Sequence, residues 1–178
     1  MRTHRTRIAL LAATALAAAA VVTPLAFGHA TLTLILPVPG TQPLANATDT
    51  WFLRVPNERY GKSTWKVVMT VPSVAQSSIT LRPTPGWKTT LGLKDTGTKD
   101  GDGNPIQLIE SITWQALKGN LIGPGKAFYG GFEFRFRNPA TAGPVCFPVD
   151  QYYNGQTKGA PVEIVQWNGA NTPCVNVV

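Results

Sequence analysis

Short runs in which apolar and polar residues alternate recur along the chain, separated by glycine, proline and asparagine. A period of two places apolar side chains on one face of a β-strand and polar side chains on the other. The pattern predicts strands over residues 31–36, 48–55, 64–71, 78–82, 87–93, 106–117, 128–137, 145–152 and 162–167. Regular short strands of this kind favour an all-β fold, a single immunoglobulin-like β-sandwich over residues 29–178.

The clearest alternation lies in residues 128–137. There Phe132, Phe134 and Phe136 alternate with charged residues, so the three rings share one face of the strand. We expect this face to pack in the core. Glu133 is then expected to point away from the core.

A turn is predicted at residues 100–104, which read Asp-Gly-Asp-Gly-Asn between two strand patterns. These residues tolerate positive φ, so a hairpin connection is expected. The segment also resembles the opening of a calcium loop, but Pro105 stands where that loop needs glycine and Ser111 where it needs a bidentate acid.

The first residues have the composition of an export signal. Arginines precede an alanine-rich apolar run over residues 8–22, and small residues follow at Ala26 and Gly28. This order predicts a secretory signal peptide over residues 1–28. No later apolar run approaches the roughly 18 residues of a membrane span. The protein is therefore expected to be exported, with a periplasmic, cell-surface or extracellular location.

Cleavage after Gly28 would make His29 the first residue of the processed chain. An α-amine and an imidazole have reference pKa values of roughly 8 and 6.5, so a divalent metal displaces few protons to bind both. Copper(II) suits such a nitrogen pair. A cut after Ala30 also satisfies the small-residue rule and would remove the site, and a histidine at such a junction can be incidental.

Removal of the leader changes the charge of the chain. The precursor has 178 residues and a formal net charge of +7. Three arginines and no acidic residues lie in the leader, so the processed chain is only mildly basic. Its basic residues are scattered, which does not indicate a nucleic-acid partner.

Cys146 and Cys174 are the only two cysteines. In an exported protein such a pair predicts one disulfide, which would stabilise the fold by roughly 3 to 4 kcal/mol in the chain-entropy model. A thiolate metal site is the alternative. A paired cysteine cannot bind copper.

Several enzyme classes require residues that the processed chain does not contain. The histidines are His4 and His29, and His4 leaves with the leader, so no hydrolytic triad or zinc cluster can form. The spacing of Glu110 and Glu133 does not indicate a glycosidase. Lytic polysaccharide monooxygenases and CopC-type copper proteins also begin with histidine, but they draw on a second one within the chain. We expect no enzymatic activity.

Six short motifs lie at residues 29–31, 53–58, 83–87, 132–134, 151–155 and 165–167. Their order resembles that of the YcnI-like family of exported bacterial copper(II)-binding domains. The resemblance implies a cohesin-like or immunoglobulin-like fold. It also implies a copper(II) site made of His29, Glu133 and Trp167.

Elementary chemistry agrees with part of that set. Amine, imidazole and carboxylate suit Cu(II), whereas Met69 is the only methionine left to favour Cu(I). Indole has a donor N–H and no free lone pair, so Trp167 should cover the metal rather than bind it.

The chain departs from the family in two places. The segment 156–161 is longer than the family pattern, and the chain stops at Val178 without the C-terminal membrane segment of many relatives. The expected function is copper capture or trafficking outside the cytoplasm, with a separate membrane copper transporter or another copper-binding protein as partner. The alternative is an adhesive or carbohydrate-binding sandwich that uses exposed Trp51 or Trp87.

Overall fold

The computed structural model describes residues 29–35, 42–154 and 161–178. The predicted signal peptide, residues 1–28, lies outside the described residues. Within them, no helix is long and apolar enough to cross a membrane. The elements are β1 (Thr31–Ile35), β2 (Thr48–Pro56), β3 (Ser63–Thr70), β4 (Thr80–Leu81), β5 (Trp87–Lys99), β6 (Pro105–Ala116), β7 (Tyr129–Arg137), β8 (Gly143–Cys146), β9 (Val149–Asn154), β10 (Glu163–Trp167), the 3₁₀-helix η1 (Gly169–Asn171) and β11 (Cys174–Val177).

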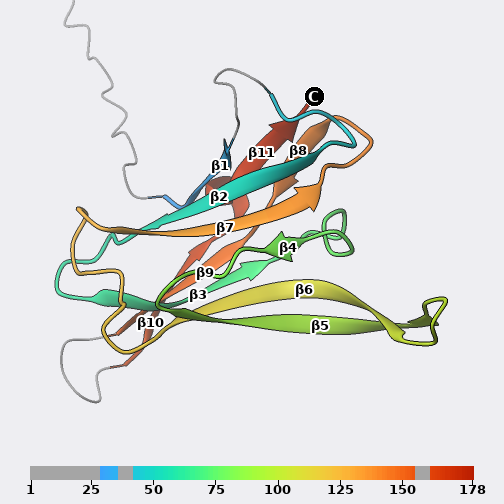
Figure 1. The fold of residues 1–178 in the computed structure, drawn as a ribbon. Helices are drawn as coiled ribbons and strands as arrows, with labels where there is room; N and C mark the ends of the chain where they lie inside the picture. The colour runs from blue at the N-terminus through green and yellow to red at the C-terminus, as the bar shows by residue number, and fades with distance from the viewer. Residues whose placement is uncertain (1–28, 36–41, 155–160) are drawn as a thin grey trace, which may run out of the picture.

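Two antiparallel sheets form the sandwich (Figure 1). The first has the order β1-β2-β7-β4 and the second the order β10-β9-β3-β6-β5. A small third sheet pairs β11 with β8. The all-β, immunoglobulin-like fold predicted from the alternating pattern is confirmed.

The core lies between the inner faces of the two large sheets. Phe132, Phe134 and Phe136 of β7 are fully buried, as their spacing predicts. Opposite them, β3 and β6 contribute Met69 and Trp114, which are also fully buried. Complete burial of an aromatic side chain contributes about 1.5–3 kcal/mol, so the alternation along β7 is a large part of what selects this register.

Two segments differ from the strand prediction. The run over residues 145–152 is not one strand but two, β8 and β9, which belong to different sheets. Pro148 lies between them and has no N–H to donate to a ladder. The strand β11 was not predicted, because it has only four residues, which is too short for a clear alternation.

The disulfide prediction is confirmed. Cys146 and Cys174 are bonded and lie directly opposite each other in the β8–β11 ladder. The bond therefore ties the last strand of the chain to the strand that precedes β9. Disulfides persist in oxidising compartments, which fits an extracytoplasmic protein.

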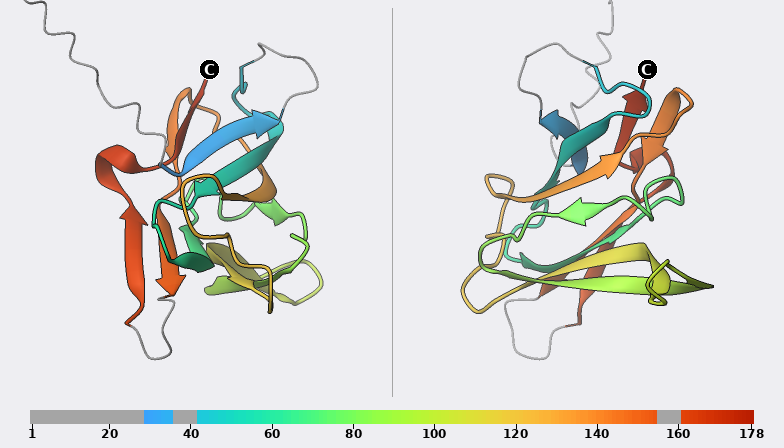
Figure 2. Two further views of the ribbon diagram at one scale, coloured as in Figure 1. Left: turned by 90° about the vertical axis from the view of Figure 1, so that its left-hand side faces the viewer. Right: turned by 45° about the vertical axis from the view of Figure 1, so that its right-hand side comes forward.

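A long hairpin formed by β5 and β6 extends past the other strands (Figures 1 and 2). Its tip is the turn predicted at residues 100–104, closed by a hydrogen bond from the Asp100 amide to the Asn104 carbonyl of 2.9 Å. The register between the two strands shifts at Gly92 and again between Asp95 and Lys99. β5 is longer than predicted, because its last residues are exposed on both faces and carry no apolar alternation.

Candidate metal centre

Trp167 ends β10 and has a side chain that faces the core. Only 3% of the residue is exposed. Its indole Nε1–H donates a hydrogen bond of 3.1 Å to the side-chain oxygen of Gln151 on the neighbouring strand β9. The polar edge of the indole is therefore satisfied inside the protein, and its orientation is set by that bond.

Gln151 is itself completely buried. Its amide nitrogen donates to the Pro56 carbonyl oxygen at 2.8 Å and to Thr64 Oγ1 at 2.7 Å. Because one side of the amide must accept from an N–H and the other must donate to a carbonyl, only one orientation of the amide satisfies all three partners. The network joins the end of β2 to β3, β9 and β10.

His29 lies against this tryptophan. The imidazole and indole ring centroids of His29 and Trp167 are 5.3 Å apart, with the ring planes tilted by 55°. Ala30, the next residue, is 3% exposed and belongs to the core, whereas His29 is half-buried. Two residues predicted to share the site, which are far apart in the sequence, are thus in contact.

Glu133 is not brought to these two residues. Its carboxylate accepts a hydrogen bond of 2.9 Å from the Arg82 guanidinium on the outer face of the first sheet. In the β-ladders Glu133 is level with Phe52, and Phe52 is level with Thr33. Residue 29 precedes Thr33 by four positions, so Glu133 is displaced by roughly 13 Å along β1 and about 10 Å across two strand spacings.

The donor set fits copper(II) only in part. Among the residues that the structure describes, no group of three or more His, Cys, Asp or Glu side chains could hold a metal ion. Both cysteines are bonded to each other. What fits is the pair of nitrogens that His29 would supply once its α-amine is free, next to an indole whose N–H is already used.

Gln151 was missed in the sequence. A signal for it exists, because Val149, Gln151 and Tyr153 alternate on the inward face of β9, where a polar residue is unusual. A buried amide at such a position needs partners on other strands. The pattern could have identified Gln151 as part of a network, although not which residues it contacts.

A second polar cluster holds the chain near the end of β2. Arg59 and Lys62 both bond the carboxylate of Glu163, with Lys62 Nζ at 2.6 Å. Hydrogen bonds from Lys62 and Arg59 lower the pKa of Glu163 below its ordinary value. Burial raises the pKa of the nearby Tyr153 phenol. This cluster contains neither an imidazole nor a thiolate. It therefore stabilises the segment after β2 and does not offer another copper site.

The two tryptophans expected to serve an adhesive role differ in exposure. Trp51 is 1% exposed and stacks on Phe136 in the core, so that part of the expectation is wrong. Trp87 is half-buried and lines a groove of about 360 Å³ between β4 and β5, together with Leu81, Arg82, Pro83, Thr89 and Leu91.

The fold is similar to that of solved bacterial proteins. An uncharacterised protein from Nocardia farcinica with an immunoglobulin-like fold is 22% identical with a TM-score of 0.59, over 84% of this chain and 98% of that one. The pilin SpaD from Corynebacterium diphtheriae, in its domains D2 and D3, is 10% identical with a TM-score of 0.43, over 78% of this chain and 50% of that one. The first of these two supports the immunoglobulin-like fold.

Two sequence comparisons address the family of this chain. No curated protein matches this sequence. Residues 38–175 match the family described as "Domain of unknown function (DUF1775)".

Proposed function

The chain belongs to that DUF1775 family of unknown function, and on this premise we propose that it is an exported protein that binds copper(II) outside the cytoplasm. The metal is held by the α-amine and one imidazole nitrogen of His29 after cleavage behind Gly28. Trp167 covers the metal without binding it, because its N–H is engaged by Gln151.

The contact between His29 and Trp167 is the observation that carries the proposal. A residue that served only as part of a leader is not expected to pack on a buried indole. The Trp167 indole is in turn held by Gln151, whose side chain has three hydrogen-bond partners. Amine and imidazole nitrogens suit Cu(II), and binding through them requires both to be unprotonated. The indole supplies an apolar wall beside these ligands, which limits the access of water.

Glu133, implied by the resemblance as a ligand, has a different role in this proposal. Its contact with Arg82 and its displacement in the sheet from His29 support an ion-pair role on the outer face of the first sheet. The remaining coordination positions of the copper ion are then left to water or to a group of a partner protein. A site with open positions suits a protein that passes its metal on.

The role that follows is capture of copper or its transfer to a separate membrane copper transporter or another copper-binding protein. No catalysis by this chain is proposed, because the processed sequence has no second histidine. The disulfide agrees with a periplasmic, cell-surface or extracellular location.

Copper titration tests the proposal directly. The chain that begins at His29 should bind one Cu(II), and binding should quench tryptophan fluorescence. A variant with one glycine added before His29 converts the amine to an amide and should bind at least roughly a hundredfold more weakly. Equal affinities of the two chains would exclude the terminus as the site.

Replacement of tryptophans locates the metal. Trp167→Phe should remove much of the quenching while leaving copper affinity nearly unchanged. Trp87→Phe is the matched control, because Trp87 lies in the groove near β4 and should not report on the metal. Loss of quenching in the control alone would place copper elsewhere.

A further inference from the structure

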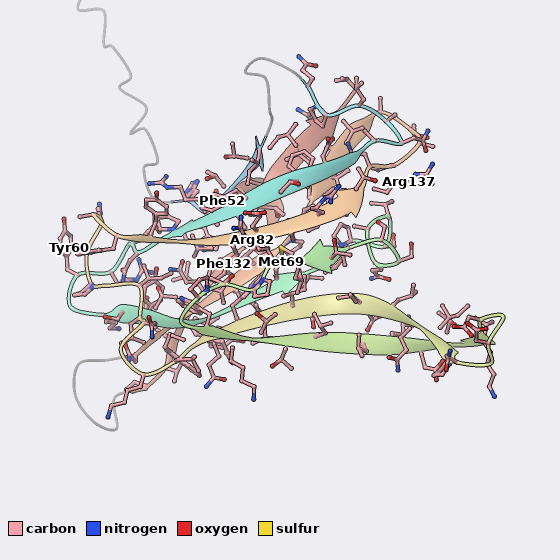
Figure 3. The ribbon with its side chains drawn as sticks, viewed as in Figure 1. Phe52, Tyr60, Met69, Arg82, Phe132 and Arg137 are labelled. Carbon is pink, nitrogen blue, oxygen red and sulfur yellow. A yellow bond between two sulfur atoms is a disulfide. The ribbon has the colours of Figure 1, made fainter. Side chains whose placement is uncertain are left out.

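One end of the sandwich exposes aromatic and aliphatic side chains. We call this surface the loop end and define it as residues 57–62 and 117–129. Tyr60 is 80% exposed, Phe128 52% and Tyr129 55%, and these are all the exposed aromatic residues in the part of the chain that the structure describes. Leu117 and Leu121 of the same surface are also exposed. Figure 3 shows Tyr60 projecting from this end.

Hydrogen bonds hold the backbone beneath these side chains. The side-chain nitrogen of Asn57, a completely buried residue, donates to the Lys62 carbonyl at 2.8 Å and to the Gly123 carbonyl at 2.6 Å. The Asn57 amide donates to the Phe128 carbonyl at 2.9 Å, and the Gly125 amide donates to the Arg59 carbonyl at 3.0 Å. The two loops are therefore fixed to each other while their apolar side chains remain in water.

Charge is distributed unevenly between the two ends of the molecule. The loop end contains four basic residues and one acid, but Arg59 and Lys62 pair with Glu163, so its unpaired positive charge comes from Lys118 and Lys126, in a segment with no acid. The opposite end, residues 95–104, has three aspartates and one lysine, all exposed, and no large apolar residue. Figure 1 shows this hairpin tip on the other side of the sandwich from the loop between β6 and β7.

We propose that the loop end binds the surface of an anionic lipid bilayer. Tyrosine, phenylalanine and leucine among lysines are the residues that insert at the boundary between headgroups and acyl chains, and basic residues are attracted to anionic headgroups. The hollows around Arg82 are lined by other residues, and the loop between β6 and β7 lies at one end of the sandwich, where a flat surface can reach it (Figure 1). A lipid surface matches both the shape and the charge.

The metal centre lies at the same end as this surface. Thr31 at the start of β1 is level with Arg54, and Arg54 is level with Gly131 near the start of β7. Binding through the loop end would therefore hold His29 close to the membrane. The lipid proposal does not depend on copper, and its test is made with a chelator present.

Vesicle binding tests the proposal with the exported protein after the cell has removed its leader. Vesicles of equal parts phosphatidylglycerol and phosphatidylcholine should carry the protein into the pellet at low salt, and binding should weaken as salt rises. Vesicles of phosphatidylcholine alone should bind it clearly less. Equal binding to both compositions, or no binding to the anionic vesicles, overturns the proposal and leaves the loop end to a protein partner.

Two pairs of substitutions locate the contact. Tyr60→Ser with Phe128→Ser should reduce partitioning roughly tenfold, whereas Leu93→Ser with Ile106→Ser, exposed residues on the hairpin, should leave it unchanged. Lys118→Gln with Lys126→Gln should also reduce it roughly tenfold.

The control for the charge change is Lys88→Gln with Lys99→Gln on β5, which alters net charge equally. All these side chains are exposed, so the variants should keep the thermal midpoint of the parent. Equal losses in the test and control pairs would mean that binding is not specific to the loop end, which overturns the assignment.

Discussion

Trp167 and Gln151 lie on neighbouring strands of the second sheet and are joined by a hydrogen bond of 3.1 Å from the indole N–H to the amide oxygen. Each is almost or completely buried, so neither can exchange its partner for water. Gln151 thus fixes the position of the indole beside His29, although none of the contacts described above joins Gln151 to the histidine.

Replacement of Gln151 by leucine should destabilise the protein by about 1–3 kcal/mol, because the Trp167 N–H and the Pro56 carbonyl lose their partners in the core. Denaturant unfolding measures this loss. Gln166→Leu is the matched control, since the Gln166 side chain is exposed and bonds Asp150 at 3.2 Å, and it should change stability by less than about 0.5 kcal/mol. Comparable losses in both variants would contradict the network's importance.

Replacement of Phe134 by alanine should cost about 3–5 kcal/mol, because its ring is fully buried between Phe136 and Phe147 and leaves a cavity. The measurement is the free energy of unfolding in urea. Phe128→Ala removes an equally large ring from an exposed position and should cost far less. A small loss for Phe134→Ala would show that the core can collapse around the gap.

Replacement of Glu133 by glutamine should leave copper affinity unchanged, because its carboxylate pairs with Arg82 and is displaced from His29 along β1 and across two strand spacings. The exposed ion pair contributes little, so stability should fall by no more than about 1 kcal/mol. Copper titration and urea unfolding of the same variant test both parts. A clear loss of affinity would restore Glu133 as a ligand and would require β7 to lie differently.

Acidification should remove the stabilising contribution of Glu163. Its pKa is lowered in the folded protein by Lys62 and Arg59, so the contribution is present above the unfolded pKa of ~4.3 and is lost as pH falls through the lower folded value. Lys62→Met should move the Glu163 pKa upward in a carboxyl NMR titration. Lys94→Met, which removes a lysine paired with Glu110 instead, should leave it in place.

Much of the fold follows from local pattern, and the site follows only in part. Alternation in β7 predicts that Phe132 faces the core and that Glu133 faces away from it, because a strand has only two faces. It does not reveal strand order. The insertion of β2 between β1 and β7 separates Glu133 from the start of β1, and no spacing along the chain encodes that order.

Residues at the margins of the sheets were harder to predict for a related reason. The end of β5 has water on both faces, so hydrophobic periodicity is absent where hydrogen bonding to β6 continues. In β9 the same periodicity places Gln151 inward, but its partners Pro56 and Thr64 are fixed only by tertiary contact.

The length and position of β5 have a consequence for behaviour at high concentration. It is the outermost strand of its sheet, and a long outermost strand is a template on which a second copy can extend the sheet. The register shift after Gly92 interrupts the ladder, and exposed charged residues, among them Lys88, Asp95 and Lys99, lie along this strand. These features act as gatekeepers, because charges and an irregular ladder oppose the pairing of this edge strand with that of a second copy.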